Sequence, residues 1–168
     1  TNVVSLHLDS LAVIYKELGI EKYVHALGHN DPGLSGNGWD GVRCRREVEK
    51  SHFKHIAKMA KTLEGIPEGN GNMLDNTLIV YLSCSGGAHH DGQKDWPFVL
   101  VGGMAKKLKM GQYLEYAGYK EKDHRTIANL YLTFMHAAGI SAPETFGQLD
   151  GSLRHLNLTG PLEELMPM

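Results

Sequence analysis

The residues best suited to chemistry in this chain are cysteine, histidine and aspartate side chains that can bind metal ions. Cys84 and the adjacent His89 and His90 lie in the stretch SCSGGAHHDGQ, directly after an apolar run. Imidazole and thiolate are good ligands for zinc and other transition metals. Adjacent residues of an extended chain point in opposite directions, so we expect one histidine of the pair to face a given site. Loop histidines bonded to backbone or water are the alternative, and spacing alone favours it.

A second pair of histidines occurs in the stretch YVHALGHN. If this segment is helical, His25 and His29 lie on one face, with a spacing that suits a metal clamp. Asp9 follows another apolar run, where it could be a carboxylate ligand or a turn residue. The candidate metal ligands are therefore Asp9, His25, His29, Cys84, His89 and His90.

Other titratable residues are expected to be structural. His52 and His55 lie among lysines, and we expect them on a solvated helix face. Cys44 lies between arginines, but a lone cysteine is more often a small buried residue. His124 is expected in the turn that begins a helix. The sequence contains no Ser-His-Asp order, no nucleotide-binding glycine fingerprint and no phosphate-binding Gly-Lys-Ser/Thr loop.

Three strands are expected to position the candidate ligands. Apolar runs predict strands over residues 77–83 and 97–101, on either side of the loop that holds Cys84. Both runs are apolar on every face, which is typical of strands buried between helix layers. A third strand is predicted over residues 3–8, which begin with β-branched side chains. Ligands bind beyond the carboxyl ends of strands in open α/β sheets. We therefore expect the loop, Asp9 and residues 25–29 to meet at one edge.

Two amphipathic helices are predicted from the 3.6-residue period, over residues 47–63 and 124–138. Asp123 is placed to cap the second helix, and Gly139 to end it. Shorter helical pieces are expected before Gly19 and near residues 162–165. The alternation of strands and helices predicts an α/β/α sandwich with a mostly parallel sheet, formed by residues 1–168 as a single domain.

Composition limits the classes of partner. The chain has 168 residues, of which 42% are hydrophobic, enough for an ordinary core. Its net charge of −2 gives no footprint for nucleic acid and no polybasic membrane patch. No apolar run reaches the roughly 18 residues of a membrane helix. Two cysteines are too few for a disulfide framework, and whether they pair stays open. We expect neither a nucleic acid nor a membrane as partner.

Several motifs resemble the alkaline phosphatase–sulfatase superfamily. MLDNTLIVYLS leads to a small-residue loop, a histidine and then WPFVLVGG. In that superfamily a similar strand leads to an Asp-His-Gly metal triplet, a further metal histidine and the next strand. Nearly the whole chain resembles the C-terminal portion of a planctomycete-type bacterial family within or near this superfamily. The other segments that carry this likeness are TNVVSLHLD, GHN, HRTIANLYLTFMHAAGI and FGQLDG.

The resemblance implies an alkaline phosphatase-like fold and, for the parent protein, a hydrolase of phosphate or sulfate esters that uses zinc or another divalent metal. His89 or His90 matches the metal histidine, and Asp9 with His25 or His29 loosely matches an Asp/His pair. The chain differs from the superfamily pattern at residues 84–86, where it has Cys-Ser-Gly instead of Asp-His-Gly. The usual two-metal cluster is therefore in doubt. The superfamily's nucleophile lies on an N-terminal segment that is not found here, so a non-catalytic binding or structural module is the alternative.

The resemblance also implies how the domain is organised and where in the cell the parent family is located. The sequence shows no signal peptide and begins almost directly on a strand-like run, so we expect the C-terminal part of a larger domain. Its sheet would then be incomplete, and exposed edges would favour a homo-oligomer or association with the missing N-terminal part. The resemblance implies export of the parent family to the periplasm or cell envelope.

Overall fold

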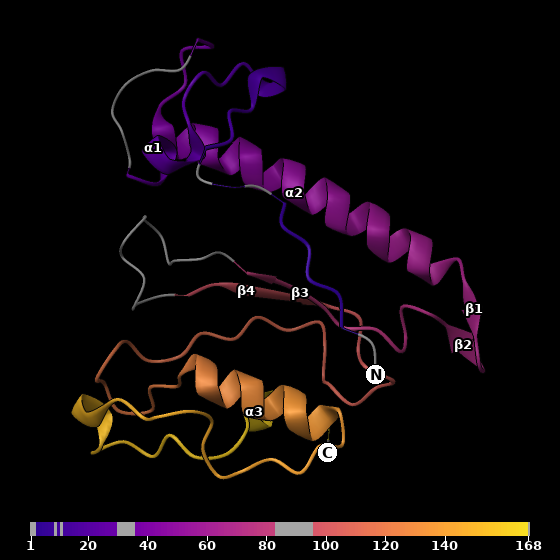
Figure 1. Cartoon of the computed structure of the whole chain (residues 1–168). Helices are drawn as coiled ribbons and strands as arrows, with labels where there is room; N and C mark the ends of the chain where they lie inside the picture. The colour runs from indigo at the N-terminus through magenta and orange to yellow at the C-terminus, as the bar shows by residue number, and fades with distance from the viewer. Residues whose placement is uncertain (1–2, 9, 11, 30–35, 83–95, 168) are drawn as a thin grey trace. The chain divides into compact units, whose positions relative to one another are not determined.

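The computed structural model describes residues 3–8, 10, 12–29, 36–82 and 96–167, which belong to two compact units. The first unit comprises Thr1–Met59 with Ser83–Trp96, and the second comprises Ala60–Leu82 with Pro97–Met168. The helices are η1 (Lys16–Leu18), α1 (Val24–Gly28), α2 (Gly41–Glu64), α3 (Ile127–Ala137), η2 (Gly151–Leu153) and η3 (Glu163–Leu165). The strands are β1 (Pro67–Glu68), β2 (Gly71–Asn72), β3 (Ile79–Leu82) and β4 (Phe98–Val101), as labelled in Figure 1.

The core of the first unit lies against α2. Asp40 begins this helix, since its Oδ1 atom accepts a hydrogen bond of 2.7 Å from the backbone N–H of Arg43. Apolar and polar positions follow the helical period, so one side of α2 is buried and the other exposed. The residues of this core cluster are Tyr15, Ile20, Leu27, Cys44 and Val48.

The core of the second unit lies against α3. This helix begins after Thr126, whose backbone N–H donates a 3.0 Å hydrogen bond to Oδ1 of Asn129. Apolar side chains of α3 pack against buried residues that precede and follow the helix in the chain. Half-buried side chains of β4 pack against the same cluster. The buried residues of this core cluster are Leu108, Leu130, Ala137, Leu162 and Leu165.

The prediction of a three-layer α/β/α sandwich with a mostly parallel sheet is wrong. β3 and β4 lie within the predicted strand ranges, but they pair antiparallel, with Ile79 opposite Val101 and Leu82 opposite Phe98. β1 and β2 form a second antiparallel pair directly after α2. Side chains of β3 and β4 are half-buried or exposed, so these strands are not buried between helix layers. An apolar run does not specify strand direction, because direction depends on the connection and on the partner strand.

The strand predicted over residues 3–8 is also wrong. These residues form neither strand nor helix, and Val3 and Val4 are 89% and 78% exposed. A β-branched run forms a strand only where a partner completes its backbone hydrogen bonds. In the described part of the chain the sheets have two strands each, β1 with β2 and β3 with β4.

The helix predictions are confirmed in position and corrected at their ends. α2 includes residues 47–63 but begins earlier, after Asp40, and α3 begins after Thr126. Asp123 does not cap α3, because it lies three residues before the cap and has a positive φ of 67°. The expected pieces before Gly19 and near residues 162–165 are the short helices η1 and η3.

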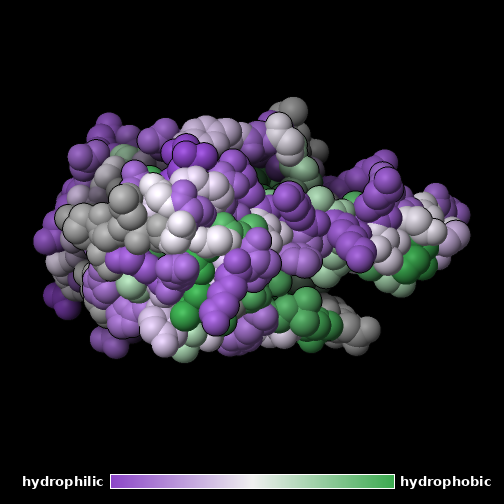
Figure 2. Space-filling view, turned by 90° about the horizontal axis from the view of Figure 1, so that it is seen from above, coloured by the Kyte–Doolittle hydropathy of each residue, from purple (hydrophilic) through white to green (hydrophobic). Residues whose placement is uncertain are grey.

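No helix among the described residues is long and apolar enough to cross a membrane. The face seen in Figure 2 is mostly hydrophilic, with hydrophobic residues in smaller patches between the polar ones.

Candidate metal-binding pair

His25 and His29 lie next to each other on one side of α1, as their spacing predicts. Their Nε2 atoms are 2.9 Å apart and share a hydrogen bond. The ring centroids are 4.8 Å apart, and the ring planes are inclined by 31°. Both side chains are exposed, so a small ligand could reach their nitrogen atoms from solvent.

Packing of its apolar side positions this short helix. Leu27 is 1% exposed and belongs to the core cluster of the first unit, so it fixes one side of α1. The backbone N–H of Val24 donates to the carbonyl of Val13 at 3.0 Å, which ties the start of α1 to an earlier segment. The backbone N–H of His29 donates to the carbonyls of His25 and Ala26, so the final turn holds the second ring above the first.

The shared hydrogen bond shows what a metal would change at this pair. One Nε2 carries the proton and the other supplies a lone pair. A metal needs both lone pairs, so the donor ring would have to carry its proton on Nδ1 instead. Zinc–nitrogen bonds of 2.0–2.1 Å in tetrahedral geometry place two ligand nitrogens about 3.3 Å apart. The observed 2.9 Å is close to that separation, so His25 and His29 fit as two ligands of one ion.

The other candidate ligands lie outside the residues that the structure describes. These are Asp9, Cys84, His89 and His90. The expectation that the 83–95 loop meets residues 25–29 therefore concerns a part of the chain that is not described. Within the described ranges, no group of three or more His, Cys, Asp or Glu side chains could hold a metal ion. The pair supplies two of the roughly four ligands that zinc requires.

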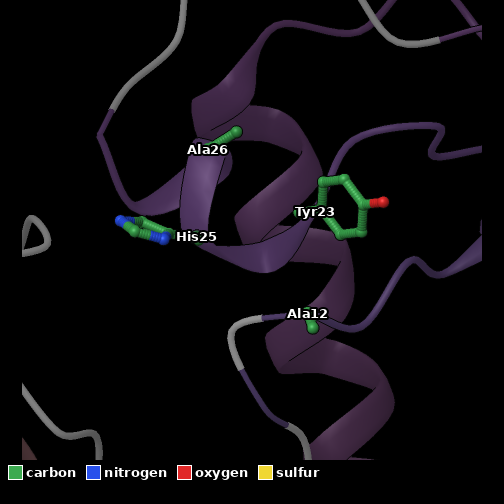
Figure 3. Close-up of a pocket in the computed structure, with 4 residues that line it drawn as sticks. All are labelled: Ala12, Tyr23, His25 and Ala26. Carbon is green, nitrogen blue, oxygen red and sulfur yellow. The ribbon is translucent and has the colours of Figure 1, made fainter.

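A shallow hollow lies next to His25. It is lined by Ala12, Tyr23, His25 and Ala26, has a volume of about 520 Å³, and is mostly apolar. Figure 3 shows that three of these residues belong to α1 and its N-terminal flank, whereas Ala12 comes from the preceding segment. Tyr23 is 54% exposed and offers an aromatic surface there.

The prediction that His52 lies on a solvated helix face is wrong. His52 is 7% exposed, and its Nε2 lies 2.8 Å from the hydroxyl of Tyr15, whereas His55 is exposed as expected. The sequence carries a signal for this, because His52 lies four residues after Val48 and four before Ile56, both buried positions of α2. Cys44 is buried, which confirms its interpretation as a core residue.

No pattern in the sequence predicts a polar cluster that lies in the second unit. The hydroxyl of Tyr119 donates to Oδ2 of Asp150 at 2.7 Å and lies 2.9 Å from Oγ of Ser152. The hydrogen bond from Tyr119, with smaller contributions from Ser152 and the charge of Lys120, lowers the pKa of Asp150 below its ordinary value. His124 meets the Tyr119 ring edge-on, and its Nδ1 is 2.9 Å from the carbonyl of Ala117. The cluster ties the loop before α3 to η2, which is a structural role.

Comparisons of the chain with protein-family models, with curated proteins and with solved structures find no match. The superfamily resemblance therefore stays a prediction.

Proposed function

We propose that the chain is part of a metal-dependent hydrolase of phosphate or sulfate esters, in which His25 and His29 bind zinc or another divalent metal. The observation that supports this is the 2.9 Å separation of the two Nε2 atoms on an exposed side of α1. A divalent metal at this pair would polarise a bound ester and activate water. Asp9, Cys84, His89 and His90 are the proposed sources of further ligands.

Metal analysis of protein purified without a histidine tag tests the first half of this proposal. After incubation with zinc and gel filtration, the chain is expected to retain one equivalent. His25→Ala and His29→Ala should each lose it, because a single imidazole binds zinc weakly. His55→Ala is the matched control, since His55 is an exposed histidine of α2. Protein that retains no zinc, or that retains it equally in all three variants, would contradict a site at this pair.

Hydrolysis of 4-nitrophenyl phosphate and 4-nitrophenyl sulfate tests the second half. We expect turnover by the parent protein with zinc, and a loss of at least about 100-fold when either histidine is replaced, because ligand changes disturb the metal directly. Zinc-dependent turnover that His25→Ala and His29→Ala leave unchanged would show that any hydrolytic centre lies elsewhere.

A non-catalytic binding or structural module is the second candidate. It is favoured by the Cys-Ser-Gly sequence at residues 84–86, where the resembling superfamily has Asp-His-Gly. Replacing a carboxylate and an imidazole by a thiol and a hydroxyl removes ligands that a two-metal centre uses. Stoichiometric zinc without turnover of either ester by the parent protein would favour this second candidate over the first.

We also propose that the chain forms a homo-oligomer, or associates with the remainder of a larger parent domain. Exposed apolar side chains on the two-stranded β3–β4 sheet support this, since Leu82 is 44% and Val99 37% exposed. Exposed apolar strands promote pairing with other chains. Light scattering across a range of concentrations should show association, and a monodisperse monomer at high concentration would count against the homo-oligomer.

A further inference from the structure

The histidine pair lies on a helix that is too short to hold its own position. α1 has five residues, little more than one turn, and isolated helices of that length are not stable in water. A metal site requires its ligand atoms to be placed to within about 0.5 Å. The contacts that attach α1 to the rest of the first unit therefore decide whether His25 and His29 can bind one ion.

Apolar packing attaches α1 to α2 but does little to fix its orientation. Leu27 is buried and belongs to the same core cluster as Cys44 and Val48 of α2. Hydrophobic contact is non-directional, so it resists rotation of a short helix about its own axis only weakly. A directional contact is required to fix the side of α1 on which the two imidazoles lie.

The backbone before α1 forms a loop that is closed by hydrogen bonds around Tyr15. The N–H of Val24, the first residue of α1, donates to the carbonyl of Val13 at 3.0 Å. Within this loop the carbonyl of Tyr15 accepts from the N–H groups of Leu18 at 3.0 Å and Ile20 at 3.2 Å. Because these bonds connect the loop internally, a displacement of Tyr15 also displaces the start of α1.

The side chain of Tyr15 attaches this loop to α2. Its hydroxyl lies 2.8 Å from Nε2 of His52, and the two side chains are 8% and 7% exposed. A hydrogen bond weakens steeply when its angle changes, and a buried polar atom that loses its partner pays the full cost of desolvation. The bond therefore fixes the loop, and with it the start of α1, at one place along α2.

We propose that Tyr15 and His52 are positioning residues for the histidine pair, and that their hydrogen bond orients α1 so that His25 and His29 present both Nε2 atoms to one ion. This inference rests on the metal site proposed above, to which it adds two buried residues outside the ligand set. Residues that orient metal ligands without binding the metal typically change metal affinity by about 10- to 100-fold when they are replaced.

Amide hydrogen exchange of the full chain tests the proposal without metal. Tyr15→Phe and His52→Leu each remove the hydrogen bond, and each should accelerate exchange at Val24 and His29 by at least about tenfold relative to amides of α3. The double variant should add little, because both replacements remove the same bond. Ile56→Ala is the matched control, since Ile56 is buried on the same side of α2 but lies outside the core cluster that contains Tyr15.

Zinc affinity and NMR of the imidazole nitrogens measure the pair itself. Titration with zinc against a chelating dye should give a dissociation constant about 10- to 100-fold higher for Tyr15→Phe than for wild type, and an unchanged one for Ile56→Ala. In metal-free protein the hydrogen bond between His25 and His29 shifts their nitrogen signals. Tyr15→Phe should move these signals toward those of an exposed histidine, and Ile56→Ala should leave them in place.

Unchanged exchange, unchanged imidazole signals or unchanged zinc affinity in Tyr15→Phe would each overturn the proposal. Equal effects of Ile56→Ala would overturn it too, because the cause would then be the stability of the unit. Wild-type protein that binds no zinc would contradict the proposed function, and exchange with the imidazole signals would then decide whether Tyr15 positions the pair. Circular dichroism establishes that each variant is folded, and His52→Gln replaces His52→Leu if the latter is not.

Discussion

The hydroxyl of Tyr15 lies 2.8 Å from Nε2 of His52, and both side chains are buried in the first unit. The two residues are 37 positions apart in the chain, so this hydrogen bond joins the segment before η1 to the middle of α2. Their rings are inclined by 59°, with centroids 6.0 Å apart. A buried imidazole is stable only when its polar atoms are paired, which makes Tyr15 part of the reason that α2 can bury a histidine.

Replacement of this hydroxyl should destabilise the protein. Tyr15→Phe keeps the ring but removes the hydroxyl that forms the buried hydrogen bond with His52 Nε2, so we expect the free energy of unfolding to fall by about 1–3 kcal/mol. Chemical denaturation measures the change. Tyr23→Phe is the control, because Tyr23 is more than half exposed and should change the free energy by less than about 0.5 kcal/mol. Equal effects of the two variants would contradict the structural role assigned to Tyr15.

Asn129 should be among the most sensitive residues of the second unit. Its Nδ2 donates to the carbonyls of Leu158 at 3.1 Å and Gly160 at 2.9 Å, and its Oδ1 accepts from Thr126. Asn129→Ala removes these bonds, and the buried carbonyl of Leu158 and the partly buried carbonyl of Gly160 lose this donor, so we expect a loss of about 2–4 kcal/mol in the free energy of unfolding.

Asn76→Ala is the matched control for that loss. Asn76 is exposed, and its side chain donates a hydrogen bond to Glu68. Surface replacements of this kind change the free energy by about 0.5 kcal/mol or less. A loss in Asn129→Ala no larger than in Asn76→Ala would mean that the side-chain hydrogen bonds of Asn129 contribute little to holding the C-terminal segment.

Two glycines provide a matched test of the turn after β4. Gly102 has a φ of +85°, and an added Cβ would collide with the carbonyl oxygen of Thr77 and lie 3.0 Å from that of Leu74. Gly111 has a φ of +76°, but a Cβ there meets nothing within 4 Å. We expect Gly111→Ala to cost about 1 kcal/mol from backbone strain alone, and Gly102→Ala about 2 kcal/mol more. Thermal unfolding of both variants checks this order, which similar melting temperatures would contradict.

The predicted elements differ in how far they depend on local sequence. α2, α3 and the positions of β3 and β4 were predictable, because periodicity and apolar runs act over a few residues. The direction of β4 and the absence of a strand over residues 3–8 were not, because pairing depends on segments distant in the sequence. The resemblance to an α/β superfamily added weight to the wrong sheet.

In the candidate site, too, features set by local sequence were predictable and contacts between distant segments were not. The closeness of His25 and His29 follows from a four-residue spacing within one helical turn. Burial of His52 was also readable from its place between Val48 and Ile56, although the neighbouring lysines suggested the opposite. Tyr119 and Asp150 are 31 positions apart, with the whole of α3 between them, so no local sequence pattern predicts their contact.

The pKa of Asp150 provides a direct test of that last partnership. The hydrogen bond from Tyr119 is the largest cause that holds this pKa below its ordinary value of 3.8, followed by hydrogen bonds from Ser152. Tyr119→Phe should therefore raise the pKa toward the ordinary value, because the carboxylate loses its strongest donor. NMR titration of the Asp150 carboxyl carbon measures it, and Tyr113→Phe is the control, since Tyr113 is 85% exposed.

The sign of the linked effect on stability follows from the direction of the shift. A carboxyl whose pKa is lower in the folded state contributes stability above its unfolded pKa and loses that contribution as pH falls through the folded value. Wild-type protein should therefore lose more stability than Tyr119→Phe as pH falls from about 5 to below the ordinary aspartate value. Denaturation curves at several pH values test this, together with the titration. If the two proteins lose stability in parallel while the pKa of Asp150 is unchanged by the mutation, the 2.7 Å contact between Tyr119 and Asp150 does not persist in solution.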